Sequence, residues 1–253
     1  MIHRGLKSDR GFECVLVDLN TQRDFCEPNG AYPVANLREL IPSLRRVYAW
    51  VRSNKTPVIS SFDSHRLTDT SFDGGPPHCL DGTWGQRKLS FTLFPQRICV
   101  EADNTLSVPG DLFTYYQQVI FRERTEDLLG NPKADRFINI LPAREFILVG
   151  NSLESAVKAL ALGLLARERR VSIVVDACGY WSMSKAEYAL RLVDAKGGQL
   201  ITVEELAARQ LNPKPRYRPF MPNGRCNGSH ESNGQPRIKA RPGSNGSLPP
   251  PSH

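Results

Sequence analysis

The stretch that decides the fold is EFILVGNSLESAVKALALGLLARERRVSIVVD, residues 145–176. It begins with a mostly apolar run that ends at Gly150, and it closes with a second apolar run, VSIVVD, that ends at Asp176. Between the two runs, residues 153–169 are rich in alanine and leucine, which predicts a helix. A strand, a helix and another strand in this order are typical of a parallel sheet, because parallel neighbours need a crossover connection.

The same alternation extends over most of the chain and predicts an α/β, three-layer, Rossmann-like fold, a parallel sheet with helices on both faces. Ligands of such sheets bind beyond the carboxyl ends of the strands, so Asp18, Asp63 and Gly150, which end three strands, should meet in one cleft. The other predicted strands cover residues 14–18, 57–63, 118–121 and 199–203, and the other predicted helices cover residues 37–53, 185–195 and 204–210.

Composition divides the 253 residues into one domain, residues 1–211, and a tail, residues 212–253. The tail is rich in Pro, Gly, Ser and Asn and is predicted to be disordered. It holds seven of the 33 basic residues and one of the 26 acidic residues, so most of the net charge of +7 lies there. The domain is therefore nearly neutral and lacks the charge signature of a nucleic-acid-binding protein.

No membrane association or secretion is expected from the sequence. No apolar run approaches the ~20 residues that span a bilayer, and residues 1–13 lack the apolar core of a signal peptide. We therefore expect a cytoplasmic protein. Neither a dinucleotide-binding G-x-G-x-x-G nor a P-loop motif is present.

Four segments in the right order carry a resemblance to a known family. The first segment is VDLNTQRDFC at 17–26 with GAYPV at 30–34, and the second is DSH at 63–65 with PHCLDGTWG at 77–85. The third is GNSLESAV at 150–157, and the fourth is VVDA at 174–177. Together they resemble the isochorismatase/nicotinamidase superfamily of cysteine hydrolases, and the second segment resembles its nicotinamidase-like branch. The resemblance covers about residues 12–210 and implies the isochorismatase-like hydrolase fold.

The resemblance implies a catalytic aspartate, lysine and cysteine that hydrolyse an amide or a vinyl ether. Asp18 matches the aspartate, but the register of residues 150–157 places Ala156 at the nucleophilic cysteine. Ser155 is a poor substitute, because adjacent helical residues point about 100° apart. The lysine should fall on Glu123, between Arg122 and Arg124, and no lysine occupies residues 121–127.

The resemblance also implies a metal loop and a ligand pocket. Asp63, His65 and His78 match three metal ligands, and Asp69 stands at the fourth position, four residues after His65. Two imidazoles and two carboxylates suit zinc, manganese or iron. The pocket is expected to include Phe25, Gly150, Asn151 and Ser152.

Three functions remain open from the sequence. The first is a catalytically impaired or inactive homologue that binds a small amide or carboxylic acid, as a homo-oligomer or paired with an active paralogue. The second is a metal-assisted amidohydrolase, acting on a nicotinamide-like substrate, that uses Asp18 and a metal-bound water. The third is an interaction module that works through the basic tail.

Overall fold

The computed structural model describes residues 11–69, 72, 75–101 and 107–211. The predicted tail, residues 212–253, therefore lies outside the described residues. The described chain contains one seven-stranded sheet in the order β3-β4-β2-β1-β5-β6-β7, and every neighbouring pair is parallel. The strands are β1 (Val15–Leu19), β2 (Val58–Asp63), β3 (Arg97–Val100), β4 (Gln118–Glu123), β5 (Glu145–Asn151), β6 (Arg170–Gly179) and β7 (Gln199–Ile201).

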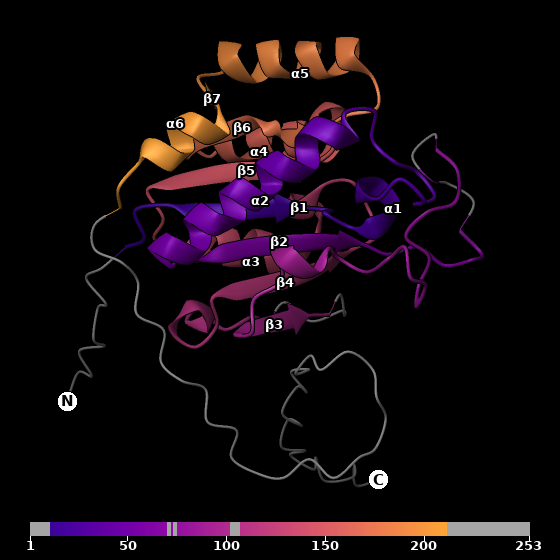
Figure 1. The fold of residues 1–253 in the computed structure, drawn as a ribbon. Helices are drawn as coiled ribbons and strands as arrows, with labels where there is room; N and C mark the ends of the chain where they lie inside the picture. The colour runs from indigo at the N-terminus through magenta and orange to yellow at the C-terminus, as the bar shows by residue number, and fades with distance from the viewer. Residues whose placement is uncertain (1–10, 70–71, 73–74, 102–106, 212–253) are drawn as a thin grey trace, which may run out of the picture.

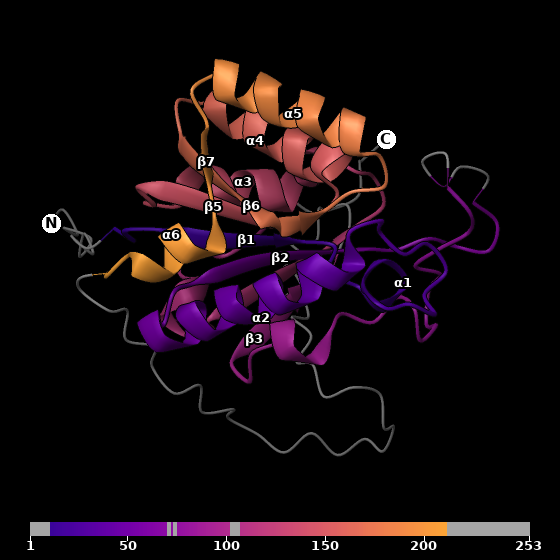
Figure 2. The ribbon, with the colours of Figure 1, turned by 45° about the horizontal axis from the view of Figure 1, so that its top comes forward.

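Helices cover both faces of this sheet, as predicted. Figures 1 and 2 show α2 and α6 on one face and α3, α4 and α5 on the other, with α1 beyond the ends of the strands. The helices are α1 (Arg23–Cys26), α2 (Leu37–Asn54), α3 (Pro132–Ile140), α4 (Lys158–Leu165), α5 (Met183–Ala195) and α6 (Val203–Ala208). Short 3-10 turns, η1 (Ser90–Thr92), η2 (Leu112–Thr114) and η3 (Leu128–Gly130), and a π-helical turn, η4 (Leu153–Val157), lie between them.

The central strand β1 shows why the fold has three layers. All five of its residues are buried, because successive side chains point to opposite faces and both faces are covered. Val15 packs with Phe137 of α3 in one apolar core, and Leu16 packs with Leu44 of α2 in the other. No helix within the described ranges is long and apolar enough to cross a membrane.

The register of the strands brings the predicted site residues to one edge of the sheet. Asp18 of β1 lies beside Ser60 of β2, and Asp63 at the end of β2 lies beside Glu123 at the end of β4. On the other side, Gly150 of β5 pairs with the last residue of β1. Asp18, Asp63 and Gly150 therefore all lie at the carboxyl edge, as the alternating pattern indicated.

The strand β3, the helices α1 and α3 and the 3-10 turns were not predicted, and one predicted helix differs. The unpredicted strand β3 has only four residues, and the unpredicted helix α3 begins where the Asn131 side chain accepts hydrogen bonds from the next turn. The helix expected at residues 153–169 starts as the π-helical turn η4, because the Ser152 carbonyl accepts a hydrogen bond from the amide of Val157, five residues on. Regular helix begins only at Lys158.

Gly150 should tolerate no side chain. Its φ is +108°, and a Cβ there would lie 2.0 Å from the Leu19 carbonyl oxygen. We predict that Gly150→Ala lowers the free energy of unfolding by about 3 kcal/mol or more, from backbone strain plus overpacking. Urea denaturation measures this effect. The control is Gly197→Ala, because Gly197 has φ +88° but open space around it, and it should cost clearly less.

Candidate functional site

Asp18 is the most enclosed charged residue of the site. It is fully buried, and its Oδ2 atom receives three groups: the Tyr48 hydroxyl at 2.7 Å, the Ser60 hydroxyl at 3.1 Å and the Lys88 ammonium at 3.0 Å. Its other oxygen, Oδ1, is buried without a hydrogen-bond partner among the described residues. Burial, followed by the negative charge of Asp18, raises the pKa of Tyr48 well above its usual value. Tyr48 therefore stays a neutral hydrogen-bond donor to Asp18.

Lys88 is the functional residue that sequence reasoning missed. It lies outside the predicted lysine window, in the loop that follows the metal-binding segment, and it is buried. The loop runs beside the end of β1, where the Arg23 amide donates to the Arg87 carbonyl and the Leu89 amide donates to the Thr21 carbonyl. A lysine with no local motif around it carries no sequence signal, because its partner is 70 positions away in the chain.

The three residues of the predicted lysine window have other contacts. The Arg122 guanidinium binds the Ser64 hydroxyl at 2.8 Å and the Asp81 carboxylate at 2.6 Å, and Arg124 lies 3.5 Å from the same carboxylate. Glu123 is buried at the end of β4, where burial first and the charge of Asp63 second raise its pKa well above the usual value. In this structure the cation next to Asp18 is thus Lys88.

The predicted metal ligands Asp63, His65 and His78 come together at the end of β2. All three are buried, and one potential ligand atom from each lies within 4.8 Å of the others. The Nε2 atoms of His65 and His78 lie 2.9 and 3.3 Å from Asp63 Oδ2. Burial by itself raises the pKa of Asp63, but hydrogen bonds from the two imidazoles lower it below its usual value. The carboxylate is therefore in the charged form that a metal ion requires.

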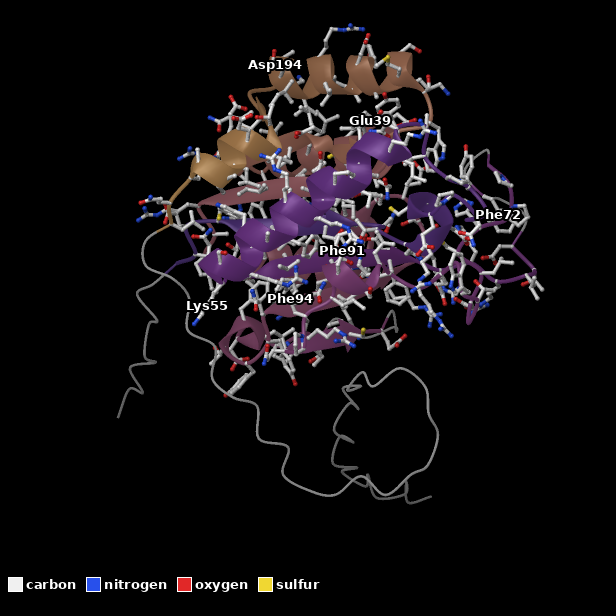
Figure 3. All side chains as sticks on the ribbon, viewed as in Figure 1. Glu39, Lys55, Phe72, Phe91, Phe94 and Asp194 are labelled. Carbon is white, nitrogen blue, oxygen red and sulfur yellow. The ribbon has the colours of Figure 1, made fainter. Side chains whose placement is uncertain are left out.

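The opposite nitrogen of each imidazole is also engaged. His78 Nδ1 lies 2.8 Å from the Pro76 carbonyl oxygen, and His65 Nδ1 lies 3.6 Å from Asp69 Oδ2. With a metal ion bound, the carbonyl beside His78 Nδ1 would hold the ring proton there and leave Nε2 as the metal-binding atom. Asp69 thus lies on the Nδ1 side of His65, beyond hydrogen-bond distance, and its role as a fourth ligand stays a prediction. Phe72, labelled in Figure 3, packs beside this cluster, with its ring centroid 5.1 Å from that of His65.

Gln22 and Asp24 fasten the metal loop to the end of β1, which gives the Q-x-D-F motif a physical role. The Gln22 amide accepts from the Asp63 backbone amide at 2.7 Å and donates to the Asp63 carbonyl at 2.9 Å. The Asp24 carboxylate accepts from the amides of Ala31 and Cys79 at 2.9 and 2.7 Å. Both ends of the loop are therefore held without the help of an ion.

The turn after β5 carries the position of the expected nucleophile. Ala156 lies in the π-helical turn, is buried and lines the pocket, so its methyl group occupies the place where the resemblance puts a thiol. Ser152 is also buried and lines the pocket, and its hydroxyl has no hydrogen-bond partner within the described part of the chain. Ser155 lines the pocket as well and is partly exposed.

Cys26 does not supply the missing thiol. Its sulfur accepts a hydrogen bond from the Asn151 side chain at 3.0 Å, and burial raises its pKa to about 12. Such a thiol stays protonated and unreactive at neutral pH. Cys26 is not among the residues that line the pocket.

The pocket itself has a volume of about 410 Å³ and joins the metal cluster to the turn after β5. Three aromatic side chains form one wall, and two of them, Tyr32 and Trp181, stack with ring centroids 4.3 Å apart. Of the four predicted pocket residues, Phe25, Asn151 and Ser152 line it, whereas Gly150 packs against the backbone of Leu19. The full lining is Asn20, Phe25, Tyr32, Asp63, His78, Glu126, Asn151, Ser152, Ser155, Ala156 and Trp181.

Comparison with known proteins agrees with this geometry. Residues 14–205 match the family model of the isochorismatase domain. The chain belongs to the isochorismatase family. No curated protein sequence gives a significant match.

Several solved structures share the fold at low sequence identity. An isochorismatase-like hydrolase from Alkaliphilus metalliredigens is 19% identical, with a TM-score of 0.61 over 77% of this chain and 97% of its own. Pyrazinamidase of Pyrococcus horikoshii, solved in complex with zinc, is 22% identical, with a TM-score of 0.58 over 75% and 99%. PnC1 from L. infantum, in complex with nicotinate, is 18% identical, with a TM-score of 0.56 over 76% and 93%.

Metal titration should separate ligands from orienting residues. We predict that Asp63→Ala abolishes Zn²⁺ binding by the purified protein, because it removes the carboxylate that both imidazoles face. Asp69→Asn should weaken binding by only about 10–100-fold, the usual effect of losing a residue that orients a ligand. Competition with a chromophoric chelator measures both affinities. If Asp69→Asn abolished binding as completely as Asp63→Ala, Asp69 would be a ligand.

Proposed function

We propose that this chain is a catalytically impaired member of the isochorismatase family that binds a small planar amide or carboxylic acid in the pocket. The observation that carries the proposal is Ala156, a buried methyl group in the pocket wall where the family resemblance puts the nucleophile. A methyl group has no lone pair with which to attack a carbonyl carbon. Losing a nucleophile that acts as a unit with its partners removes several orders of magnitude of rate.

The lining of the pocket supports a planar ligand. The pocket lies between the metal-binding cluster and the turn after β5, so a small ligand in it would contact both. The wall of Phe25, Tyr32 and Trp181 offers ring faces and edges to an aromatic or conjugated group. At the other end, the unpartnered Ser152 hydroxyl is available to hydrogen-bond an amide or acid oxygen.

A metal ion is the second part of the proposal. Asp63, His65 and His78 would hold Zn²⁺, Mn²⁺ or Fe²⁺, because their donor set and the anchored Nδ1 atoms fit such an ion. A divalent ion there would act as a Lewis acid toward a ligand oxygen or nitrogen. The zinc complex of the Pyrococcus horikoshii pyrazinamidase supports this proposal.

The alternative function is metal-assisted hydrolysis of an amide. It is favoured by the unpartnered Oδ1 atom of Asp18, a buried acceptor able to take a proton from water or ligand. The substrate would be a small amide of the nicotinamide type. The two functions differ in one observable quantity, which is turnover by the wild type.

Ammonia release from nicotinamide tests the proposal. With added Zn²⁺, Mn²⁺ or Fe²⁺, the wild type should release no more ammonia than Asp18→Asn, because a methyl group stands where the resemblance puts the nucleophile. Ala156→Cys should raise the rate by about 10³-fold or more, since it returns the nucleophile to a site that keeps its other groups. A coupled assay for ammonia measures the rates, and the control is Ala161→Cys, a buried alanine of α4 away from the pocket.

Turnover by the wild type that Asp18→Asn abolishes would overturn the impaired-enzyme proposal and support metal-assisted hydrolysis. Failure of Ala156→Cys to gain activity, with the fold intact, would show that more than the nucleophile has been lost.

The assembly state belongs to the same proposal. We propose that the chain forms a homo-oligomer or pairs with an active paralogue, as the family resemblance implies. Light scattering of the purified protein measures the first arrangement directly.

A further inference from the structure

We infer that Lys88 is the positioning cation of this site, and that it stands in for the lysine that the family resemblance expects at position 123. The inference rests on the proposed function and deepens it, since it names a residue that prepares Asp18 to face a ligand. It is carried by the contacts of Lys88, by its burial and by the acidic residue at position 123.

The contacts of Lys88 fix the orientation of the Asp18 carboxylate. The ammonium lies 3.0 Å from Asp18 Oδ2 and donates to the Ser61 carbonyl at 2.9 Å. Together with Tyr48 and Ser60, it saturates Oδ2 and leaves Oδ1 without a partner among the described residues. One oxygen is thus held by three donors and the other has unused capacity to accept a hydrogen bond or a proton.

The pair of charges formed by Lys88 and Asp18 is buried, so it carries a desolvation cost. Lys88 is 8% exposed and Asp18 is 0% exposed. Removing two charges from water is costly, and a buried pair offsets that cost only with good geometry and further hydrogen bonds. Replacing such a pair by hydrocarbon side chains is often neutral or stabilising, so stability alone does not account for these two charges.

The residue at position 123 is glutamate, where the family resemblance expects a lysine. Glu123 ends β4 beside Asp63, and Lys88 donates to the carbonyl of Ser61, two residues before Asp63 on β2. Lys88 therefore reaches the same neighbourhood from the loop that a side chain at position 123 reaches from the sheet. Position 123 thus carries an acid where the resemblance expects a lysine, and one positive charge still lies next to Asp18.

The chemical consequence is that the site lacks one group and not two. Asp18 and a cation are present, the metal-binding cluster is present, and the nucleophile at position 156 is absent. The inference therefore predicts that the positive charge of Lys88 shifts a thiol introduced at position 156 toward its ionised form.

The test adds further substitutions to the Ala156→Cys variant and measures the reactivity of the introduced thiol. It needs neither a ligand nor turnover. The alkylation rate of that thiol by iodoacetamide is followed between pH 5 and 9 by peptide mass spectrometry. Adding Lys88→Met should slow alkylation at pH 7 by about tenfold or more, since losing one neighbouring positive charge shifts a thiol by about one pKa unit. The matched control is Lys133→Met, another buried lysine, which lies on α3 and bonds the Glu101 carbonyl.

Relocating the charge separates electrostatics from packing. Adding Glu123→Lys to Lys88→Met moves the ammonium to the end of β4 and should restore the alkylation rate to within about threefold of the background. If Lys88→Met alone does not fold, recovery of a cooperative thermal transition by Glu123→Lys supports the inference in the same way.

Three results would overturn the inference. They are an unchanged alkylation rate in folded Lys88→Met, a loss of the same size in Lys133→Met, and a relocated variant that restores neither the rate nor the fold. Ammonia release by the wild type would instead overturn the impaired-enzyme proposal and would not affect the inference on Lys88. The failure of one proposal can therefore be told from the failure of the other.

Discussion

A fully buried carboxylate at the carboxyl edge of the central strand is the constraint on which the rest of the site depends. Asp18 has no exposed surface, and an isolated charge in such a place would be too costly to keep. The cost is offset by Lys88, Tyr48 and Ser60, which come from a loop, from α2 and from β2. The site can therefore form only when the sheet, the helix layer and the loop are all in place.

One continuous loop links this ion pair to the metal-binding cluster. It leaves β2 at Asp63, carries His65 and His78, and returns beside the end of β1 with Lys88. Gln22 holds its first residue by two backbone hydrogen bonds. The same loop therefore bears both the imidazoles and the ammonium.

The site has polar and aromatic groups that could contact a ligand, but it has an alanine where the family resemblance puts a nucleophile. Groups that bind and orient a ligand are present, in the aromatic wall, the Ser152 hydroxyl and the Asp63 cluster. The group that would attack a ligand is replaced by the methyl of Ala156. The buried ion pair, the imidazole pair and the alanine at position 156 are the observations behind the binding role proposed above.

The fold could be predicted from the sequence because its signals are local. Apolar runs such as residues 145–150 and the alanine-rich segment after them report burial and helix propensity over neighbouring residues, and both appear in the structure as β5 and α4 with η4. Short elements gave weaker signals, so the four-residue strand β3 and the helix α3 were missed. The carboxyl-edge placement of Asp18, Asp63 and Gly150 followed from topology alone.

The sequence by itself determined the α/β architecture, the family, the clustering of Asp63, His65 and His78, and the alanine at position 156. Only the tertiary structure decided that Lys88 is the cation beside Asp18 and that Asp69 lies behind His65. Periodicity and spacing in the sequence report on the secondary structure and burial of residues that are close in the chain. A charge pair between residues 70 positions apart depends on how a loop returns to the sheet, and that path is set by hydrogen bonds that no local pattern records.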